Sequence, residues 1–429
     1  MTYEEALSFL SERLTFGIKP GLERVNALLD AVGHPERDYK TIHVTGTNGK
    51  GSVTAYIASV CYQSGCKVGR YTSPHLMDYT ERIRINDVDI SQEDFGIYIG
   101  KIAETAPRNA EGQIEATEFD ILTAAAFLYF KDQGVDYAVI EVGMGGLLDS
   151  TNIITPLVSV ITNVTLDHTK YCGNTVQEIA QQKAGIIKSS VPVVTAAQVP
   201  ALAVIEKTAK KKKAPLYVFD KDFSIASRSA STMGQMITFK EEGKPDAMLF
   251  TRLQGRHQAV NLACAAKACR LLMQSDSRIS EETMREGLAM TAWPGRFEII
   301  KIDGRTIVLD GAHNAAGAEA FHMTYEEVFK DRPKQLVMAI LADKDISSIV
   351  AQVVLPKDKV ITVPAPTPRT MNPEKLAHMM PVEAEAASSV AAGMDKAWQT
   401  MDKEAVLVVC GSLYILGQVK AWLAEKQAN

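Results

Sequence analysis

The sequence is poor in the features that mark secreted, metal-stapled and membrane proteins. Its six cysteines include no C-x-x-C pair, which argues against a disulfide framework or a zinc site. No apolar run approaches the roughly 20 residues that cross a bilayer, and the first residues, MTYEEALSFL, are acidic, unlike a signal peptide. We therefore expect buried, reduced thiols and a cytoplasmic protein.

An excess of positive charge is also missing. Lys and Arg number 46 against 51 Asp and Glu, which gives a net charge of -5. Binding to nucleic acid in general needs a basic surface, so we expect no nucleic-acid partner. The one basic run, residues 207–213, is interpreted as the solvated end of a surface helix rather than as a binding patch.

The pattern that is present belongs to a large α/β protein. A chain of 429 residues exceeds one core of ordinary size, so we expect two domains, residues 1–295 and 296–429, divided at a Trp-Pro-Gly break. Short runs rich in Val and Ile alternate with helical patterns, which is typical of a parallel sheet wrapped by helices. The expected strands are TIHVTG, KVGRYTS, DYAVIEVG, LVSVITNV and VPVVTA in the first domain, and TIVLDG, QLVMAIL, VITVPA and AVLVVCGS in the second.

One stretch of the first domain departs from this alternation. Residues 215–254 combine short runs with turn residues, and this predicts an antiparallel patch attached to the main sheet. A helix is expected to follow at about residues 257–275.

A strand, a glycine-rich turn and a helix meet in HVTGTNGKGSVTAY, residues 43–56. The stretch does not fit the pattern G-x-x-x-x-G-K-[ST], because Gly51 separates Lys50 from Ser52. Backbone N–H groups and a helix N-terminus still converge on one point, which favours phosphate binding over a plain glycine turn. Lys50 would reach the outer phosphates, and Ser52 suits Mg²⁺.

Polar residues also follow the neighbouring strands, where ligands of open parallel sheets bind. Ser73 follows the second strand, Glu141 ends the third, and Asp167 and His168 follow the fourth. Each is weak evidence alone, but together Ser73, Glu141 and His168 could hold a hard cation beside the phosphates. Histidine is the member least expected from the chemistry of Mg²⁺.

In the second domain, polar residues stand at strand–helix junctions. Asp310 and His313 lie in LDGAHNAAG, and Ser412 and Tyr414 lie in CGSLY. Arg296 follows the Trp-Pro-Gly break, where it could neutralise phosphate. Each junction is open to two interpretations, a functional site or a helix cap.

These motifs resemble the folylpolyglutamate synthase and dihydrofolate synthase group of the Mur ligase superfamily. The matching segments, in order, are FGIKPGLERV, HVTGTNGKGSV, YTSPHL with ERIRIN, ATEFDILTAAAF, EVGMGGLLDSTN, DHTKYCGNTVQEIAQQKAGIIK, GRHQAVNLACA, WPGRFE, LDGAHNAAG and GSLY. The resemblance implies a P-loop-containing, Mur-ligase-type ATPase domain with a parallel central sheet that binds ATP and folate. It also implies a smaller, C-terminal, Rossmann-like α/β domain that binds glutamate.

The activity implied is that of an ATP-dependent ligase acting as a monomer on small molecules. The carboxylate of a folate (tetrahydrofolate polyglutamate) or of dihydropteroate takes the γ-phosphoryl group, and the amine of L-glutamate displaces phosphate. Mg²⁺, Lys50 and Arg296 would neutralise the meeting anions. Two alternatives stay open: a Mur-type ligase acting on a cell-wall nucleotide precursor, and a nucleotide-binding regulator without catalysis.

The resemblance also assigns roles to residues. The catalytic residues implied are Lys50, Glu141, His168, Lys183 and Arg296, with Lys183 matching a lysine that carries a carbamate. The ATP site implied comprises Thr47, Asn48, Gly49, Lys50, Gly51, Ser52, Asn261, Arg296 and Asp310, and the metal ligands are Ser52, Ser73, Glu141 and His168. The pterin would lie near Thr117, Phe119, Asp120, Leu148, Asp149 and Ser150, and glutamate near His313, Ser412 and Tyr414. Phe119 has a second interpretation, as a packed core aromatic.

Two positions depart from the family pattern. Leu147 stands where the family usually has the arginine of G-G-R-x-D, and Gln182 stands where it usually has the glutamate before K-A-G. We hypothesise that these positions pair in relatives and were neutralised together here. A separation of more than about 10 Å would contradict that hypothesis, because direct coupling needs near contact.

Overall fold

The computed structural model describes residues 1–14, 17, 19–112 and 114–428. Two residues of the FGIKPGLERV motif, at positions 16 and 18, lie outside the described residues. The chain forms two compact units. Unit 1 comprises Met1–Ser227, Ile237–Phe250 and Val260–Thr291, and unit 2 comprises Arg228–Met236, Thr251–Ala259 and Ala292–Asn429.

Unit 1 is built on an eight-stranded sheet in the order β4-β3-β2-β5-β1-β6-β7-β8. The six strands from β2 to β8 in that order run parallel, and β3 and β4 are antiparallel additions at one edge. The strands are β1 (Lys40–Thr45), β2 (Val68–Tyr71), β3 (Ile83–Ile85), β4 (Val88–Asp89), β5 (Tyr137–Glu141), β6 (Val158–Ile161), β7 (Val193–Thr195) and β8 (Leu216–Val218). All five predicted strands of the first domain are present because their apolar runs are buried on both faces.

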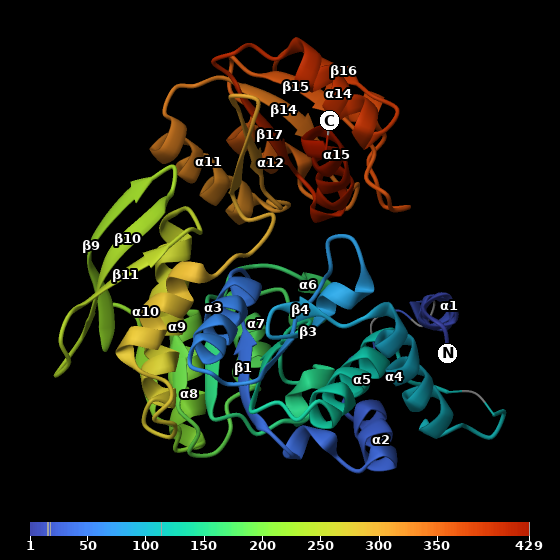
Figure 1. The fold of residues 1–429 in the computed structure, drawn as a ribbon, viewed down its shortest axis with the longest axis vertical. Coiled ribbons are helices and arrows are strands. Elements are labelled where there is room, and N and C mark those ends of the chain that lie inside the picture. Colours follow the sequence, from blue (N-terminus) through green and yellow to red (C-terminus); the bar gives the residue numbers. More distant parts are fainter. Residues whose placement is uncertain (15–16, 18, 113, 429) are drawn as a thin grey trace. The chain divides into compact units, whose positions relative to one another are not determined.

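Of the α-helices among the described residues of this part of the chain, six lie in connections between strands of the main sheet, two precede β1, and two follow residue 251 (Figure 1). They are α1 (Tyr3–Leu14), α2 (Glu23–Val32), α3 (Lys50–Gln63), α4 (Gln92–Thr105), α5 (Glu118–Asp132), α6 (Thr169–Cys172), α7 (Val176–Ala184), α8 (Ala201–Lys211), α9 (Arg256–Leu272) and α10 (Glu281–Met290), with the 3-10 helices η1 (Pro35–Arg37), η2 (Tyr79–Arg82) and η3 (Ser150–Ile153). One core joins α2, α4 and α5 through Leu28, Ile99 and Phe127, and a second joins α7 and α8 through Ile179 and Ile205.

The predicted patch over residues 215–254 is only partly correct. β8 joins the main sheet beside β7, but β9 (Phe223–Ser231), β10 (Gly234–Glu241) and β11 (Ala247–Thr251) form a separate three-stranded sheet. The three strands pair with one another, and Glu241 of β10 is tied to α9 by ion pairs with Lys267 and Arg270. The attachment to the main sheet was therefore wrong, because strand type can be read from local pattern whereas the pairing partner depends on tertiary contacts.

Unit 2 carries a six-stranded sheet in the order β12-β13-β17-β14-β15-β16, parallel except for β12 at its edge. Its strands are β12 (Glu298–Ile302), β13 (Arg305–Leu309), β14 (Lys334–Met338), β15 (Lys359–Thr362), β16 (Ala384–Ala386) and β17 (Val406–Cys410). Its helices are α11 (Ala315–Phe329), α12 (Ile346–Val353), α13 (Pro373–His378), α14 (Val390–Thr400) and α15 (Leu416–Ala428), with the 3-10 helix η4 (Leu413–Ile415). The predicted α/β class is confirmed for both units.

Two further expectations concern solvent and membrane. All six cysteines are buried and free, as expected for reduced thiols. Among the described residues, no helix combines the length and the apolar character needed to cross a membrane.

Candidate active site

The glycine-rich loop, residues 46–49, here called the phosphate loop, joins β1 to α3, and the side chain of Lys50 folds back over it. Gly49 precedes α3 with a left-handed backbone (φ 84°), so Lys50 begins the helix. Lys50 Nζ donates to the carbonyl oxygens of Gly46 at 3.0 Å and Thr47 at 3.2 Å. The ammonium group therefore lies over the loop, beside the helix N-terminus that favours an anion.

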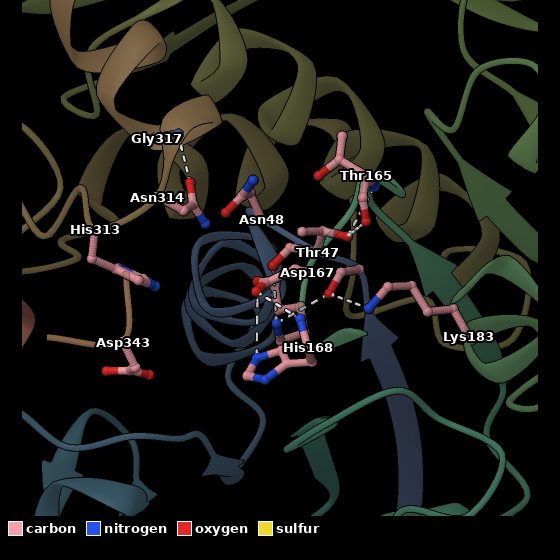
Figure 2. Close-up of polar contacts among 12 residues, drawn as sticks. Thr47, Asn48, Thr165, Asp167, His168, Lys183, His313, Asn314, Gly317 and Asp343 are labelled. Atoms are coloured by element: carbon pink, nitrogen blue, oxygen red, sulfur yellow. Dashed lines mark hydrogen bonds and ion pairs between the residues drawn. The ribbon is translucent and has the colours of Figure 1, made fainter. Parts of the chain in front are cut away.

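Three side chains fasten this loop to the segment that follows β6. Thr162 Oγ1 donates to the carbonyl of Asn48 at 2.6 Å, and Asn163 Oδ1 accepts the Asn48 amide at 2.9 Å. Thr47 Oγ1 donates to the carbonyl of Thr165 at 3.1 Å (Figure 2). Sequence reasoning missed Thr162, Asn163 and Thr165, although polar residues at the end of the predicted strand LVSVITNV and directly after it were a signal for them.

Two glycines of the loop have no room for a side chain. A Cβ on Gly46 (φ +155°) would lie 1.8 Å from Thr162 Oγ1, and one on Gly49 would lie 2.4 Å from Asn261 Oδ1. Asn261, predicted for the ATP site, therefore lies against the phosphate loop from α9. The loop is held in a fixed shape by neighbours on two sides.

Lys183 reaches the same loop from the last turn of α7. It is buried, and its Nζ donates to the Gly46 carbonyl at 2.8 Å (Figure 2). Burial, and then the nearby Lys50 ammonium, lower the pKa of Lys183 to about 7. At neutral pH a large fraction of this side chain is therefore the uncharged amine, the form that reacts as a nucleophile.

Two of the predicted metal ligands meet at the end of β5. The Ser73 amide donates to Glu141 Oε2 at 3.2 Å, and Glu141 is buried. Ser52 is buried in the first turn of α3. His168 precedes α6 with a left-handed backbone, and its amide donates to Asp167 Oδ1 at 2.8 Å (Figure 2). Among the described residues there is no cluster of three or more His, Cys, Asp and Glu side chains suited to a metal.

The residues predicted near the pterin are joined by hydrogen bonds. Thr117 caps α5, and its amide and hydroxyl both donate to Asp120 Oδ2, at 2.9 and 2.8 Å. Asp120 is buried, and it also accepts from Arg24 Nε at 2.9 Å and from Ser150 Oγ at 2.7 Å. Arg24 was missed by the sequence reasoning, although it lies in the quoted segment FGIKPGLERV.

Phe119 and Asp149 flank this network. The Phe119 ring is part-buried, lies 5.9 Å from that of Tyr71, and occupies the space where a Cβ on Gly143 would be, 2.5 Å from Phe119 Cζ. Asp149 caps η3 and accepts the Met144 amide at 2.8 Å, while burial raises the pKa of its carboxyl group. Leu148 is 42% exposed, and its carbonyl accepts the Gly21 amide at 3.2 Å.

The two positions that depart from the family pattern touch. The Leu147 amide donates to the Gln182 carbonyl at 2.7 Å. A Cβ on Gly185 would lie 2.4 Å from Leu147 Cα, so the loop carrying Leu147 packs directly on the end of α7. The distance condition set for coupling between these positions is met.

In unit 2 the predicted residues follow β13 and β17, except Arg296, which precedes β12. Asp310 is part-buried, accepts the amides of Phe297 at 2.8 Å and Ala312 at 2.7 Å, and has a pKa raised by burial. Arg296 Nη1 donates to the carbonyl of Gly295 at 3.2 Å.

The remaining unit 2 residues lie at helix starts. His313 Nδ1 lies 2.8 Å from the Gly311 carbonyl, the geometry of an N–H donor, and the neighbouring Asn314 caps α11 through the Gly317 amide at 2.7 Å (Figure 2). Ser412 is buried and caps η4 through the Tyr414 amide at 3.3 Å, while Tyr414 is 40% exposed.

Family models match most of the chain. The Mur ligase middle domain matches residues 44–269, and the Mur ligase glutamate ligase domain matches residues 295–413. The first match begins in β1 and includes the phosphate loop, Glu141, His168, Lys183 and Asn261. The second begins just before Arg296 and includes Asp310 and His313.

Individual relatives agree with the family match. The chain is 35% identical over 431 residues to folylpolyglutamate synthase of Lacticaseibacillus casei, covering 99% of each chain. It is 39% identical over 354 residues to dihydrofolate synthase/folylpolyglutamate synthase of Bacillus subtilis, covering 81% of this chain and 82% of the relative.

Solved structures extend the agreement to three dimensions. The folylpolyglutamate synthase of Mycobacterium tuberculosis complexed with ADP matches with a TM-score of 0.88 and 30% identity, covering 98% of this chain and 97% of that one. E. coli FolC in complex with DHPP and ADP matches with a TM-score of 0.87 and 28% identity, covering 100% and 99%. The chain thus belongs to the folylpolyglutamate synthase and dihydrofolate synthase family of the Mur ligases, and it is an ATP-dependent ligase.

Proposed function

We propose that the chain joins L-glutamate to the carboxylate of a reduced folate, of dihydropteroate, or of both. The observation that carries the proposal is the phosphate loop, with Lys50 over its carbonyls and the Ser73–Glu141 pair at the next strand ends. The named activities of the L. casei and B. subtilis relatives support the same substrates. The E. coli structure with DHPP and ADP supports a pterin-type ligand beside a nucleotide.

In the proposed reaction, a carboxylate oxygen of the folate-type substrate attacks the γ-phosphorus of ATP, and ADP leaves. The glutamate amine then attacks the acyl phosphate carbon, loses a proton, and expels inorganic phosphate. Lys50 balances the charge that gathers on the γ-phosphoryl oxygens in the first step. Arg296 would offer a second fixed cation to the same anions.

The residues present fit Mg²⁺ rather than a metal held entirely by protein. Mg²⁺ keeps several waters and binds through one or two carboxylates together with substrate phosphates. Ser52, Ser73, Glu141 and His168 offer two hydroxyls, one carboxylate and one imidazole, and the backbone amide of Ser73 donates to the Glu141 carboxylate. Bound Mg²⁺ would supply charge neutralisation at the phosphates.

Lys183 is proposed to carry a carbamate. Its neutral amine would add to CO₂ with loss of one proton, which turns a buried cation into an anion. Burial and the pKa of about 7 favour the amine that this addition needs. The carbamate would then attract a cation beside Gly46.

The functional domains are proposed to be residues 1–295 and 296–429, with glutamate recognised in the second. His313, Ser412 and Tyr414 follow two adjacent strands of the unit 2 sheet, β13 and β17, where α/β proteins bind their ligands. Asn261, Arg296 and Asp310 are proposed for the nucleotide. A monomeric state and a cytoplasmic location remain predictions from the sequence.

The deciding experiment measures ADP release with ATP, glutamate and one acceptor at a time: tetrahydrofolate, dihydropteroate, or a cell-wall nucleotide precursor. We expect release with one or both pterin acceptors and none with the precursor. Lys50→Ala is expected to lower kcat/KM about a thousandfold, while Lys221→Ala, at a lysine that is 68% exposed, is the matched control. ADP release that ignores glutamate and both pterins would overturn the proposal.

A further inference from the structure

A polar face of β1 lies against the loop that follows β5, residues 142–151, here called the substrate loop. Side chains alternate along a strand, so His43 and Thr45 lie on one side of β1. His43 Nε2 is 2.9 Å from Thr151 Oγ1, and Thr45 Oγ1 donates to the Gly145 carbonyl at 2.7 Å. The strand that leads into the phosphate loop thus also holds the substrate loop, at its middle and at its end.

The donor in the His43 contact follows from its neighbours. Thr151 Oγ1 donates to Asp149 Oδ1 at 2.5 Å, and a hydroxyl has only one proton to give. His43 therefore donates from Nε2–H, and its Nδ1 is an acceptor. Burial lowers the pKa of His43 to about 3, which agrees with a neutral ring in this one tautomer.

The other ring nitrogen of His43, Nδ1, shows that packing alone does not account for a histidine at this position. His43 is fully buried, and its Nδ1 has no hydrogen-bond partner among the described residues. A buried polar atom without a partner is unfavourable, so an apolar residue would suit the strand better if packing were its only task. The single bond that the ring makes, to Thr151, is the feature that an apolar residue would lose.

The hydrogen bond between His43 and Thr151 is linked, through Thr151, to Asp149, which is predicted to lie near the pterin. Thr151 supports Asp149 through its hydroxyl and its amide, and Asp149 in turn accepts the Met144 amide at 2.8 Å. Between these anchored points, Leu147 and Leu148 are 44% and 42% exposed. The hydrogen-bond chain from β1 therefore fixes the base of a loop whose apolar side chains are open to a ligand.

We propose that His43 is a positioning residue for the pterin-bearing substrate, acting through Thr151 and Asp149 on the substrate loop. This inference rests on the proposed function, because it takes the substrate loop as the place where that substrate binds. His43 touches no reacting atom in this scheme. Its loss should weaken binding of the folate-type substrate without weakening binding of ATP.

The test compares KM for tetrahydrofolate or dihydropteroate with KM for ATP in four variants. His43→Leu removes the donor, and Thr151→Val removes the hydroxyl while keeping the branched shape. His43→Gln replaces the donor near Nε2. Thr54→Val is the matched control, because the Thr54 hydroxyl is buried without a hydrogen-bond partner among the described residues.

We expect His43→Leu and Thr151→Val each to raise KM for the pterin substrate about tenfold, with KM for ATP within about twofold of the wild type. His43→Gln should recover most of the loss. The inference would be overturned if His43→Leu and Thr151→Val raised both KM values equally, or raised neither. It would also be overturned if His43→Gln recovered none of the loss, or if neither His43→Leu nor Thr151→Val folded. Failure of the proposed function is distinct, because the wild-type protein would then release no ADP with either pterin substrate.

Discussion

The two parallel sheets end in polar loops that are held in different ways. In unit 1, the phosphate loop is joined to residues more than a hundred positions away: Thr47 to Thr165, Asn48 to Asn163, and Gly46 to Lys183. In unit 2, Asn314, Asn372 and Ser412 each cap the helix that begins beside them, through amides two or three positions on. The loops that follow the strands of the unit 1 sheet, here called the unit 1 edge, are held by long-range hydrogen bonds. The corresponding loops of the unit 2 sheet, here called the unit 2 edge, are held largely by local ones.

The difference bears on preorganisation. A loop that several neighbours hold keeps its amides in place before a phosphate arrives, which is what electrostatic stabilisation of a transferring phosphoryl group requires. A helix cap stabilises its own helix and says little about the next loop. Substitutions at the unit 1 edge should therefore change catalysis, whereas substitution of a unit 2 cap outside the proposed glutamate site, such as Asn372, should change stability.

Among the tests of this comparison between the two edges, the largest effect is expected from Gly46→Ala. The added methyl would lie 1.8 Å from Thr162 Oγ1, so the phosphate loop or the Thr162 segment must shift. Misplacement of about 1 Å near a reacting phosphate costs roughly a hundredfold in rate, and we expect that fall in kcat/KM. Gly243→Ala is the control: an alanine at its φ of +72° would also be strained, but nothing lies within 4 Å of the added Cβ. Equal activity of the two variants would break the comparison between the edges.

A smaller effect is expected from pH, through Lys183. Its pKa of about 7 lies below the ordinary lysine value of 10.5, so the amine dominates above pH 7 and the ammonium below it. The amine fraction falls from about one half at pH 7 to about one tenth at pH 6. Since CO₂ adds only to the amine, kcat/KM should fall about fivefold over this interval and should fall on removal of CO₂ at pH 7. Steady-state rates in degassed and bicarbonate-supplied buffers check this. Rates that ignore CO₂ would contradict the carbamate.

Asn372→Ala tests the unit 2 edge, where the hydrogen bonds are local. The Asn372 side chain accepts the Lys375 amide at 2.9 Å and caps α13. Its loss should lower the free energy of unfolding by about 1 kcal/mol and leave kcat/KM within about twofold of the wild type. Urea unfolding and steady-state assays on one preparation measure both. A large loss of activity would show that this edge is also built for catalysis.

The smallest effect concerns the pair at which the chain departs from its family. Leu147→Arg with Gln182→Glu would place opposite charges on positions whose backbones are 2.7 Å apart. Both positions are accessible to solvent, so we expect the double variant to be about 0.5 kcal/mol more stable than the sum of the single variants predicts. Additive unfolding free energies would remove the hypothesis that these positions are coupled.

Much of the molecule could be predicted because local pattern carried it. The runs around Val44 and Ile140 are apolar on both faces, as central parallel strands must be, and Gly49 with Lys50 marks a phosphate loop. The short β4 and β12, at the edges of the two sheets, and β3 beside β4 escaped prediction because they are two to five residues long and contain charged residues. The separate sheet of β9, β10 and β11 escaped because no local pattern names a pairing partner.

The site shows the same limit. Residues at the carboxyl ends of predicted strands could be found by position alone, and these include Glu141 and Asp310. Arg24 could not, because its role depends on a partner 96 positions away. Thr162 stands at the end of a predicted strand, but its bond to Asn48, 114 positions away, could not be predicted. The only signal for His43 in the sequence is that the buried strand TIHVTG contains a histidine and two threonines, and this composition also suits an ordinary strand.

The six buried cysteines give the protein a practical property. Burial raises the pKa of each thiol that it shifts, Cys264 to about 12, so the folded chain should react slowly with alkylating reagents. A single cysteine placed at an exposed position such as Lys221 would then be the only thiol to take up a fluorescent label quickly. The natural sequence thus offers a background for spectroscopic labelling without removal of any native cysteine.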